Sequence, residues 1–325
     1  MSELRNALVD WTAQGRLPAV ALPAALQLAG ITPTTRDWRR FFDRLCLWLG
    51  AIFLAAAVIF FFAYNWQEMG RFAKFGLVEA LIAGAALLAW RLDLQRTTGK
   101  AALLFITLLI GALLALVGQT YQTGADTYEL FAVWALAALP LVVVGQFGAL
   151  WLFWLALLNL AVALYFQIFW GVFGVFGLLF SPEKLLWTLF LLDTAALCLW
   201  EFCAWRGIAW MRERWSARVL AVASGSLVAA LALYAIFDTG SNAAGALAYL
   251  LWMAAAYAYY RHRTRDIFVL AGGVLSAIVV IAAFLSNLML RHGDGGAFLL
   301  IGMLVIGLSA AGGMWLKAIA VEDRP

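Results

Sequence analysis

Charged residues are scarce in this sequence. Only 12% of its 325 residues are Asp, Glu, Lys or Arg, whereas 66% are hydrophobic, and the mean hydropathy is +0.92. A soluble globular domain carries about 25% charged and about 45–50% apolar residues. The shortage of charge therefore excludes an ordinary soluble domain. It predicts an all-α, polytopic integral membrane bundle of about ten transmembrane helices.

Cysteine and histidine are also rare, with three and two residues respectively. The cysteines, Cys46, Cys198 and Cys203, lie in or beside apolar runs and show no CxxC spacing, so a Cys/His metal site is not expected. The sequence also lacks the GxSxG, HExxH and GxxxxGK[ST] motifs of common hydrolase, metalloprotease and nucleotide-binding sites. We therefore expect no metal, no cofactor and no enzymatic activity.

Long apolar runs are what the sequence has in abundance. A membrane-spanning helix needs about 20 mostly apolar residues. Ten runs reach or approach this length: 45–65, 73–90, 101–118, 129–145, 149–166, 185–204, 217–236, 243–260, 267–290 and 297–318. They divide the chain into a first segment, 1–44, a transmembrane bundle, 45–318, and a tail, 319–325.

The basic residues are distributed unevenly between the two sides of the predicted bundle. With ten spans, 18 of the 22 Lys and Arg residues fall on the side of the N-terminus and only four on the opposite side. Cytoplasmic connections carry an excess of Lys and Arg, so both termini are predicted to be cytoplasmic. The pI of about 9.1 is then explained by topology, and nucleic acid is not expected as a partner.

The first 44 residues include a candidate amphipathic helix. Thr34 or Thr35 is a plausible N-cap, and Trp38, Phe41 and Phe42 then share one helical face. The arginines that border this face are Arg36, Arg39, Arg40 and Arg44. This pattern is typical of an interfacial helix that binds anionic membrane lipids. The alternative is a polar lead-in to the first span.

Residues 168–180 form an apolar segment that is too short to span the membrane. The charge pattern places it on the outer side, in the interface or partly re-entrant. Its glycines recur every third residue at Gly171, Gly174 and Gly177, so a helix here would have a smooth ridge. We interpret the ridge as a packing surface, with a gate as the alternative.

The segment GQTYQTGADTYELF, residues 118–131, is the most polar stretch between two spans, and the topology places it outside. Asp126 precedes Glu129 by three residues, just before an apolar run, which predicts a capping box at a helix start. Capping requires none of the four remaining polar side chains. These are Gln119, Tyr121, Gln122 and Tyr128. Together with Asp126 and Glu129, they are candidates for a polar path or a binding site.

Three further polar residues fall within predicted spans: Glu79, Asn159 and Asp193. An acid near mid-membrane costs about 2.5–3.5 kcal/mol and often marks an ion or substrate path. Asp193 has no basic residue at its depth, so we expect it either to be a proton or substrate site, or to hydrogen-bond Asn159 or a thiol. Glu201, nearer the cytoplasmic edge, is expected to pair with Arg206.

Two stretches, FFFAYNW at 60–66 and GQTYQTGADTYELF at 118–131, resemble a family of bacterial membrane proteins, the domain of unknown function 2157. The resemblance covers roughly residues 4–150. It implies a bacterial inner membrane location and an extracytoplasmic partner, a small membrane-anchored protein with a GDYxxLxY motif. It implies no activity and no catalytic residue.

Two classes of function remain open from the sequence. The first is the handling or transport of a small solute or lipid head group along a polar path through the bundle. The second is a non-catalytic membrane subunit whose outer loops dock a partner protein. The intramembrane acids favour the first, and the short loops favour the second.

Overall fold

The computed structural model describes residues 2–64, 70–122, 124–170, 182–238, 243–290 and 297–322. All the regular secondary-structure elements of these residues are helices, which confirms the predicted all-α class. The chain forms two compact units, Met1–Gln122 and Thr123–Pro325. The boundaries predicted between the segments 1–44, 45–318 and 319–325 rest on membrane topology rather than on compact units, and they stay a prediction.

Nine helices in the described part of the chain are long and apolar enough to cross a membrane. They are α3 (Thr35–Tyr64), α4 (Arg71–Arg91), α5 (Thr97–Tyr121), α6 (Thr127–Gly145), α7 (Gly148–Trp170), α9 (Pro182–Trp205), α10 (Arg214–Phe237), α12 (Ile267–Leu290) and α13 (Ala297–Glu322). The predicted span 243–260 corresponds to α11 (Ala244–His262), which is long enough. It is not among the nine, because four tyrosines and an arginine reduce its hydropathy. The fold is that of a multi-pass membrane protein.

The first unit begins with α1 (Ser2–Ala13), a short 3-10 turn η1 (Ala19–Ala21) and α2 (Leu22–Leu28). The predicted N-cap is confirmed at Thr34, whose hydroxyl oxygen accepts a hydrogen bond of 3.3 Å from the backbone N–H of Asp37. From Thr35, α3 continues for 30 residues, so the candidate interfacial segment and the first predicted span belong to one helix. At about 1.5 Å per residue, this helix is longer than the hydrocarbon core of a bilayer, about 30 Å thick.

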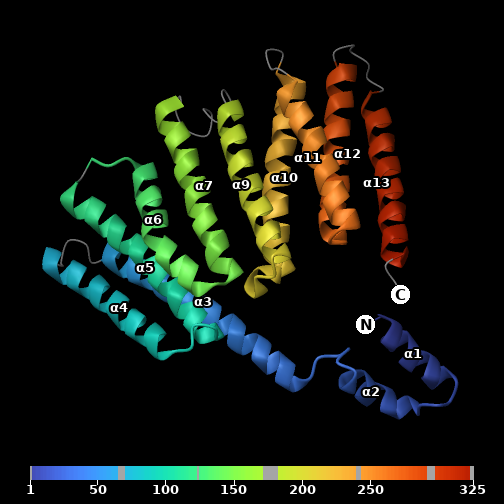
Figure 1. The fold of residues 1–325 in the computed structure, drawn as a ribbon, viewed down its shortest axis with the longest axis horizontal. Coiled ribbons are helices and arrows are strands. Elements are labelled where there is room, and N and C mark those ends of the chain that lie inside the picture. The colour runs from blue at the N-terminus through green and yellow to red at the C-terminus, as the bar shows by residue number, and fades with distance from the viewer. Residues whose placement is uncertain are drawn as a thin grey trace. The chain divides into compact units, whose positions relative to one another are not determined.

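The core of the first unit lies where α5 packs against both α3 and α4 (Figure 1). One side chain from each helix, Phe62, Val78 and Leu116, forms a buried cluster at this contact. Because α5 is covered on two sides, it carries most of the buried residues of this unit.

The second unit contains α6, α7 and α9 to α13, with a 3-10 turn η3 (Ala209–Arg212) before α10. Helix α10 packs against α9, α11 and α12 and also touches α7 (Figure 1). Glycines allow the approach of α11 to α10. A Cβ on Gly245 would lie 2.6 Å from the carbonyl oxygen of Leu231, and a Cβ on Gly225 would lie 2.9 Å from the indole ring of Trp252. At Gly245 an added side chain would meet the backbone of α10 and force the two helices apart, whereas at Gly225 it would displace the Trp252 ring.

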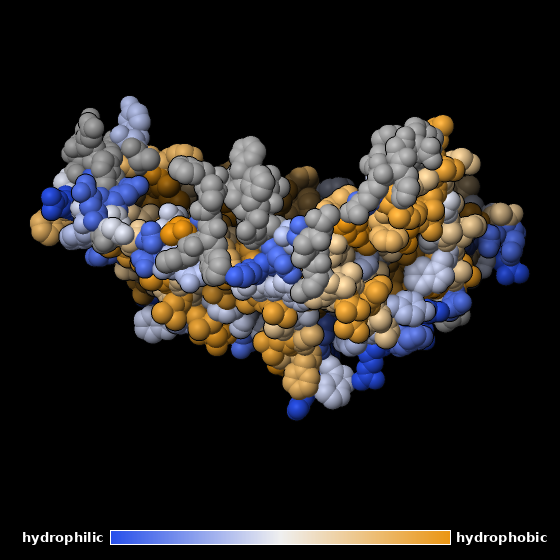
Figure 2. Space-filling view, turned by 90° about the horizontal axis from the view of Figure 1, so that it is seen from above, coloured by the Kyte–Doolittle hydropathy of each residue, from blue (hydrophilic) through white to orange (hydrophobic). Residues whose placement is uncertain are grey.

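Large apolar side chains cover much of the surface that Figure 2 shows. On α6 and α11, for example, Leu136 is 71% exposed and Leu251 is 72% exposed. In water this exposure would be unfavourable, but lipid tails are as apolar as these side chains. The surface is therefore that of helices surrounded by lipid.

The predicted outer segment 168–180 is only partly described. Helix α7 extends through its first residues to Trp170. The glycine ridge at Gly171, Gly174 and Gly177 lies outside the described residues.

Candidate functional site

The segment 118–131 contains the boundary between the two units. On one side of it, α5 ends at Tyr121, and its C-cap Gln122 takes a left-handed conformation with φ of 44°. On the other side, the predicted capping box is confirmed at the start of α6. The backbone N–H of Asp126 donates to Glu129 Oε2 at 3.3 Å, and the Asp126 side chain accepts from the backbone of Glu129. The two acids therefore have a structural role.

The remaining polar side chains of this segment lie on helix surfaces. Gln119 is exposed, and the exposed ring of Tyr121 lies 5.9 Å from that of Phe75. Tyr128 is half-buried and contacts Tyr165 edge to face at 5.3 Å. These contacts are aromatic packing within each unit, and none of the cavities described below is lined by these residues.

Asp193 is buried, with 4% of its surface exposed. The expected partner is confirmed, because Asn159 Nδ2 donates to Asp193 Oδ1 at 2.9 Å and joins α7 to α9. The same amide also donates to the carbonyl of Leu155 in its own helix at 2.9 Å. Glu79 lies in the other unit, exposed on α4. A single path lined by Glu79 and Asp193 is not tested and stays a prediction.

Glu201, near the end of α9, is the centre of a second polar cluster. It is 7% exposed. Its Oε2 accepts from Arg214 Nη1 at 3.0 Å and from the Tyr259 hydroxyl at 3.1 Å, and its Oε1 accepts from the Tyr260 hydroxyl at 3.0 Å. The expected pairing with Arg206 is wrong. The Arg206 guanidinium instead lies over the ring of Phe202, 5.0 Å from its centroid.

The cluster extends through Arg214 to Asp266, which precedes α12. Asp266 is 4% exposed and accepts from Arg214 Nε at 3.3 Å and from Arg218 Nε at 3.0 Å. Burial alone would raise the pKa of Asp266, but the hydrogen bonds and ion pairs with Arg218 and Arg214 outweigh it and hold the pKa below the ordinary value. The cluster thus ties α9, α10 and α11 to the turn before α12.

A groove with a cavity volume of about 550 Å³ begins at this cluster and runs between α9 and α11. Each wall is a stripe of side chains at helical spacing. The α9 wall consists of Thr194, Leu197, Cys198, Glu201, Phe202 and Trp205, and the α11 wall consists of Trp252, Ala255, Ala256, Tyr259, Tyr260 and Arg263. We call this the α9–α11 groove. From Thr194 to Glu201 it follows two turns of helix, about 10 Å.

One end of the α9–α11 groove carries a net positive charge. Within the polar cluster, the carboxylates of Glu201 and Asp266 are balanced by the guanidiniums of Arg214 and Arg218. Arg263, exposed at the end of α11, adds a cation to this balanced set. Away from this end the walls are mostly apolar, with Thr194 at the far end.

The far end of the groove is fixed by a chain of hydrogen bonds. Trp252 Nε1 donates to Ser224 Oγ at 2.9 Å, and Ser224 Oγ lies 2.7 Å from Thr194 Oγ1. These bonds connect α11 to α10 and α10 to α9. They hold the Trp252 indole at the groove wall.

None of the nine residues proposed from the sequence lines the α9–α11 groove. The groove was missed because each wall looks apolar when its helix is read alone. A signal did exist: Trp252, Tyr259 and Arg263 recur at positions that share a helical face, and Glu201 and Thr194 are seven residues apart on another helix. Within the described residues, no group of three or more His, Cys, Asp or Glu side chains could hold a metal ion.

No curated protein and no solved structure matches the chain. A family model matches residues 9–151, and these do not include the α9–α11 groove. The match therefore supports the membrane class and concerns only the first part of the chain. From α1 to the beginning of α7, residues 9–151 match the model of the family described as Predicted membrane protein (DUF2157), which confirms the resemblance seen in the sequence.

Proposed function

We propose that this membrane protein binds an anionic phospholipid in the α9–α11 groove, with the phosphate at Arg263 and one acyl chain along the apolar walls. The observation that carries the proposal is the combination of an apolar groove with a surplus cation at one end. The proposal narrows the broader expectation of a protein that handles a small solute or a lipid head group.

The position of the groove favours a lipid over a water-soluble ligand. Its walls are α9, which is apolar enough to span the membrane, and its neighbour α11. Lipid is the solvent between such helices, so an acyl chain can enter sideways without crossing water. A polar solute would have to leave water for walls formed by side chains such as Leu197, Phe202 and Ala256.

The charge at the groove end favours an anionic head group. Arginine binds phosphate through charge-assisted hydrogen bonds, and Arg206, whose guanidinium lies over the groove residue Phe202, adds a second cation beside the groove. The bias of Lys and Arg supports a bacterial inner membrane orientation in which this end faces the cytoplasm. The cytoplasmic leaflet contains anionic lipids, which are attracted to exposed arginines.

Transport along a polar path through Asp193 forms no part of this proposal. The Asp193 carboxylate is hydrogen-bonded to Asn159, and it lines none of the three cavities described. Binding of a lipid requires only the α9–α11 groove.

The test is the thermal stability of the purified protein in detergent, with added phosphatidylglycerol or phosphatidylcholine. Phosphatidylglycerol should raise the Tm more than phosphatidylcholine. Ala255→Phe fills the groove and should abolish this rise. Ala254→Phe makes the same change at an exposed position of α11 outside the groove lining and should retain it.

The variant Arg263→Gln tests the contribution of the phosphate head group separately from that of the acyl chain. It should remove the preference for phosphatidylglycerol and leave a smaller response common to both lipids. An equal response of Ala255→Phe and Ala254→Phe would contradict the proposal. That result would favour the alternative function, a non-catalytic subunit that docks an extracytoplasmic partner.

A further inference from the structure

A second cavity lies toward the opposite end of α11. It has a volume of about 1040 Å³ and is lined by the end of α10, the first half of α11 and the second half of α12. Its size matches that of pockets that enclose a drug-sized ligand, about 300–1,000 Å³. Small side chains create the space. They are Ala232, Ala235, Ala243, Ala246 and Ala277. We call this the α10–α12 cavity.

The polar groups of the α10–α12 cavity are few, and they differ from those of the groove. Among the described residues of its lining, Asp238 is the charged one; it lies half-buried directly after α10, and the Tyr234 hydroxyl donates to its carboxylate. Asn287 lies at the same end on α12, where its amide donates to the carbonyl of Ile236. Deeper inside, the Tyr249 hydroxyl lies 3.1 Å from Ser276 Oγ. The described lining thus has an acid at one end and an apolar interior.

We propose that the α10–α12 cavity binds a lipophilic cation, with the positive charge beside Asp238 and the apolar body among the alanines of α10 and α11. A carboxylate next to a low-dielectric cavity attracts a cation more strongly than one in open water, because less solvent screens the pair. The apolar walls supply binding free energy in proportion to the apolar surface that the ligand buries. A strongly hydrated cation would gain little from these walls.

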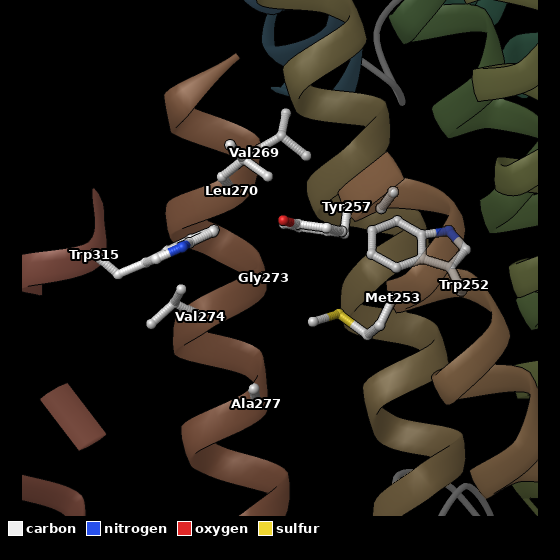
Figure 3. A pocket seen from close by; sticks show the side chains of 10 residues that line it. Trp252, Met253, Tyr257, Val269, Leu270, Gly273, Val274, Ala277 and Trp315 are labelled. Atoms are coloured by element: carbon white, nitrogen blue, oxygen red, sulfur yellow. The ribbon is translucent and has the colours of Figure 1, made fainter. Parts of the chain in front are cut away.

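The apolar interior continues toward a third, smaller cavity. This cavity has a volume of about 140 Å³ and lies between α11, α12 and Trp315 of α13 (Figure 3). It shares the lining residues Met253 and Ala277 with the α10–α12 cavity. In Figure 3 the Met253 side chain reaches from α11 toward α12, and a Cβ on Gly273 would lie 3.4 Å from its terminal methyl.

Met253 therefore lies at the boundary of the two cavities. Its side chain is unbranched and flexible, so it is suited to a partition that a ligand can displace. We infer that Met253 sets how long an apolar tail the site accepts. A ligand whose tail passes Met253 would gain the apolar surface of Tyr257, Val274 and Trp315.

The test measures binding of radiolabelled tetraphenylphosphonium to the full chain in nanodiscs. The unmodified protein should bind it, and Asp238→Asn should bind about tenfold more weakly, which corresponds to the loss of one partly buried ion pair. Ala246→Phe fills the cavity and should also reduce binding, while Ala254→Phe should not. Neutral triphenylphosphine oxide should compete poorly.

Two results would overturn the site. One is unchanged binding in both Asp238→Asn and Ala246→Phe, and the other is competition by the neutral compound as strong as that by the cation. The inference does not rest on lipid binding in the α9–α11 groove, because Asp238 and Ala246 are absent from that groove and Ala255 and Arg263 are absent from this cavity.

The role of Met253 is tested with triphenylphosphonium ions that carry a methyl or a dodecyl chain. Met253→Ala joins the two cavities, so it should strengthen binding of the dodecyl ion about three- to tenfold and leave the methyl ion nearly unchanged. Met253→Leu keeps the partition and serves as the control. An equal effect of Met253→Ala on both ions would refute the role of Met253 as a length limit.

Discussion

Asn159 on α7 and Asp193 on α9 are joined by a hydrogen bond of 2.9 Å between the amide nitrogen Nδ2 and the carboxylate oxygen Oδ1. Asn159→Leu removes this donor and leaves a buried acceptor, which should destabilise the protein by about 1–3 kcal/mol. Asp193→Asn still presents a carbonyl oxygen to the Asn159 amide and should be nearly neutral. Thermal unfolding in detergent measures both effects. A larger loss in Asp193→Asn than in Asn159→Leu would mean that the carboxylate itself is required.

The capping box of α6 gives a second comparison. Asp126→Asn keeps an equally good N-cap and should leave the Tm unchanged, while Asp126→Leu should cost about 1 kcal/mol. The amount of folded protein and complementation of a deletion strain are the measurements. Loss of complementation by Asp126→Asn at normal expression would show that the charge binds a cation or a partner.

The Glu201 cluster depends on Arg214. Arg214→Gln leaves Glu201 and Asp266 buried without their shared cation. Breaking a fully buried ion pair costs about 3–5 kcal/mol. Because 32% of the Arg214 side chain is exposed to solvent, we expect the free energy of unfolding to fall by on the order of 2–3 kcal/mol. The same substitution at Arg96, whose pair with Asp93 is exposed at 3.6 Å, should have no measurable effect on Tm. Equal effects of the two changes would contradict the importance of the buried cluster.

Asp266 makes stability depend on pH in the acid range. Its folded-state pKa lies below the ordinary value of 3.8, which applies to the unfolded chain. As pH falls toward and below that value, the unfolded chain takes up the proton first. The stabilisation from Asp266 is therefore complete above this range and is lost as pH falls through the folded-state pKa. The Tm of the unmodified protein should fall more steeply below about pH 5 than that of Asp266→Asn. If the Tm of the two proteins fell with pH to the same extent, this role of Asp266 would be contradicted.

Orientation is tested by labelling. Single cysteines placed in 121–127 of a variant free of native cysteine should react with a membrane-impermeant thiol reagent in cells whose outer membrane is permeabilised. Cysteines in 207–213 should react only after lysis. The reverse pattern would invert the predicted topology and place the Arg263 end of the groove outside.

The helices could be predicted from the sequence because each apolar run is a local property. The capping box at Asp126 and the N-cap at Thr34 were also predictable, since both depend on residues three positions apart. For Asp193, the free-energy cost of an unpaired buried acid predicted a hydrogen bond to Asn159 or to a thiol as one of two possibilities, and Asn159 is the partner found. Each of these inferences needs only one helix or one pair of residues.

The α9–α11 groove could not be predicted in the same way. Glu201 was assigned to the nearby Arg206, but its partners come from positions 13, 58 and 59 residues further along the chain. Which helices lie side by side depends on packing, as when Gly245 and Gly225 allow α11 to approach α10. Hydropathy carries little information on these choices, because the faces concerned are mostly apolar.

The composition of α11 has a consequence for how the chain enters the membrane. Because of its tyrosines and Arg261, the most apolar stretch of α11 is less hydrophobic than that of each of the nine candidate spans of the described residues, so partitioning into lipid is less favourable for α11 on its own. Trp252 and Tyr249 offset this by bonding Ser224 on α10 and Ser276 on α12. The synthesis of α10 precedes that of α11, and a hydrogen-bond acceptor on α10 is then already in place. We therefore expect α10, α11 and α12 to leave the translocon as one assembly rather than one by one.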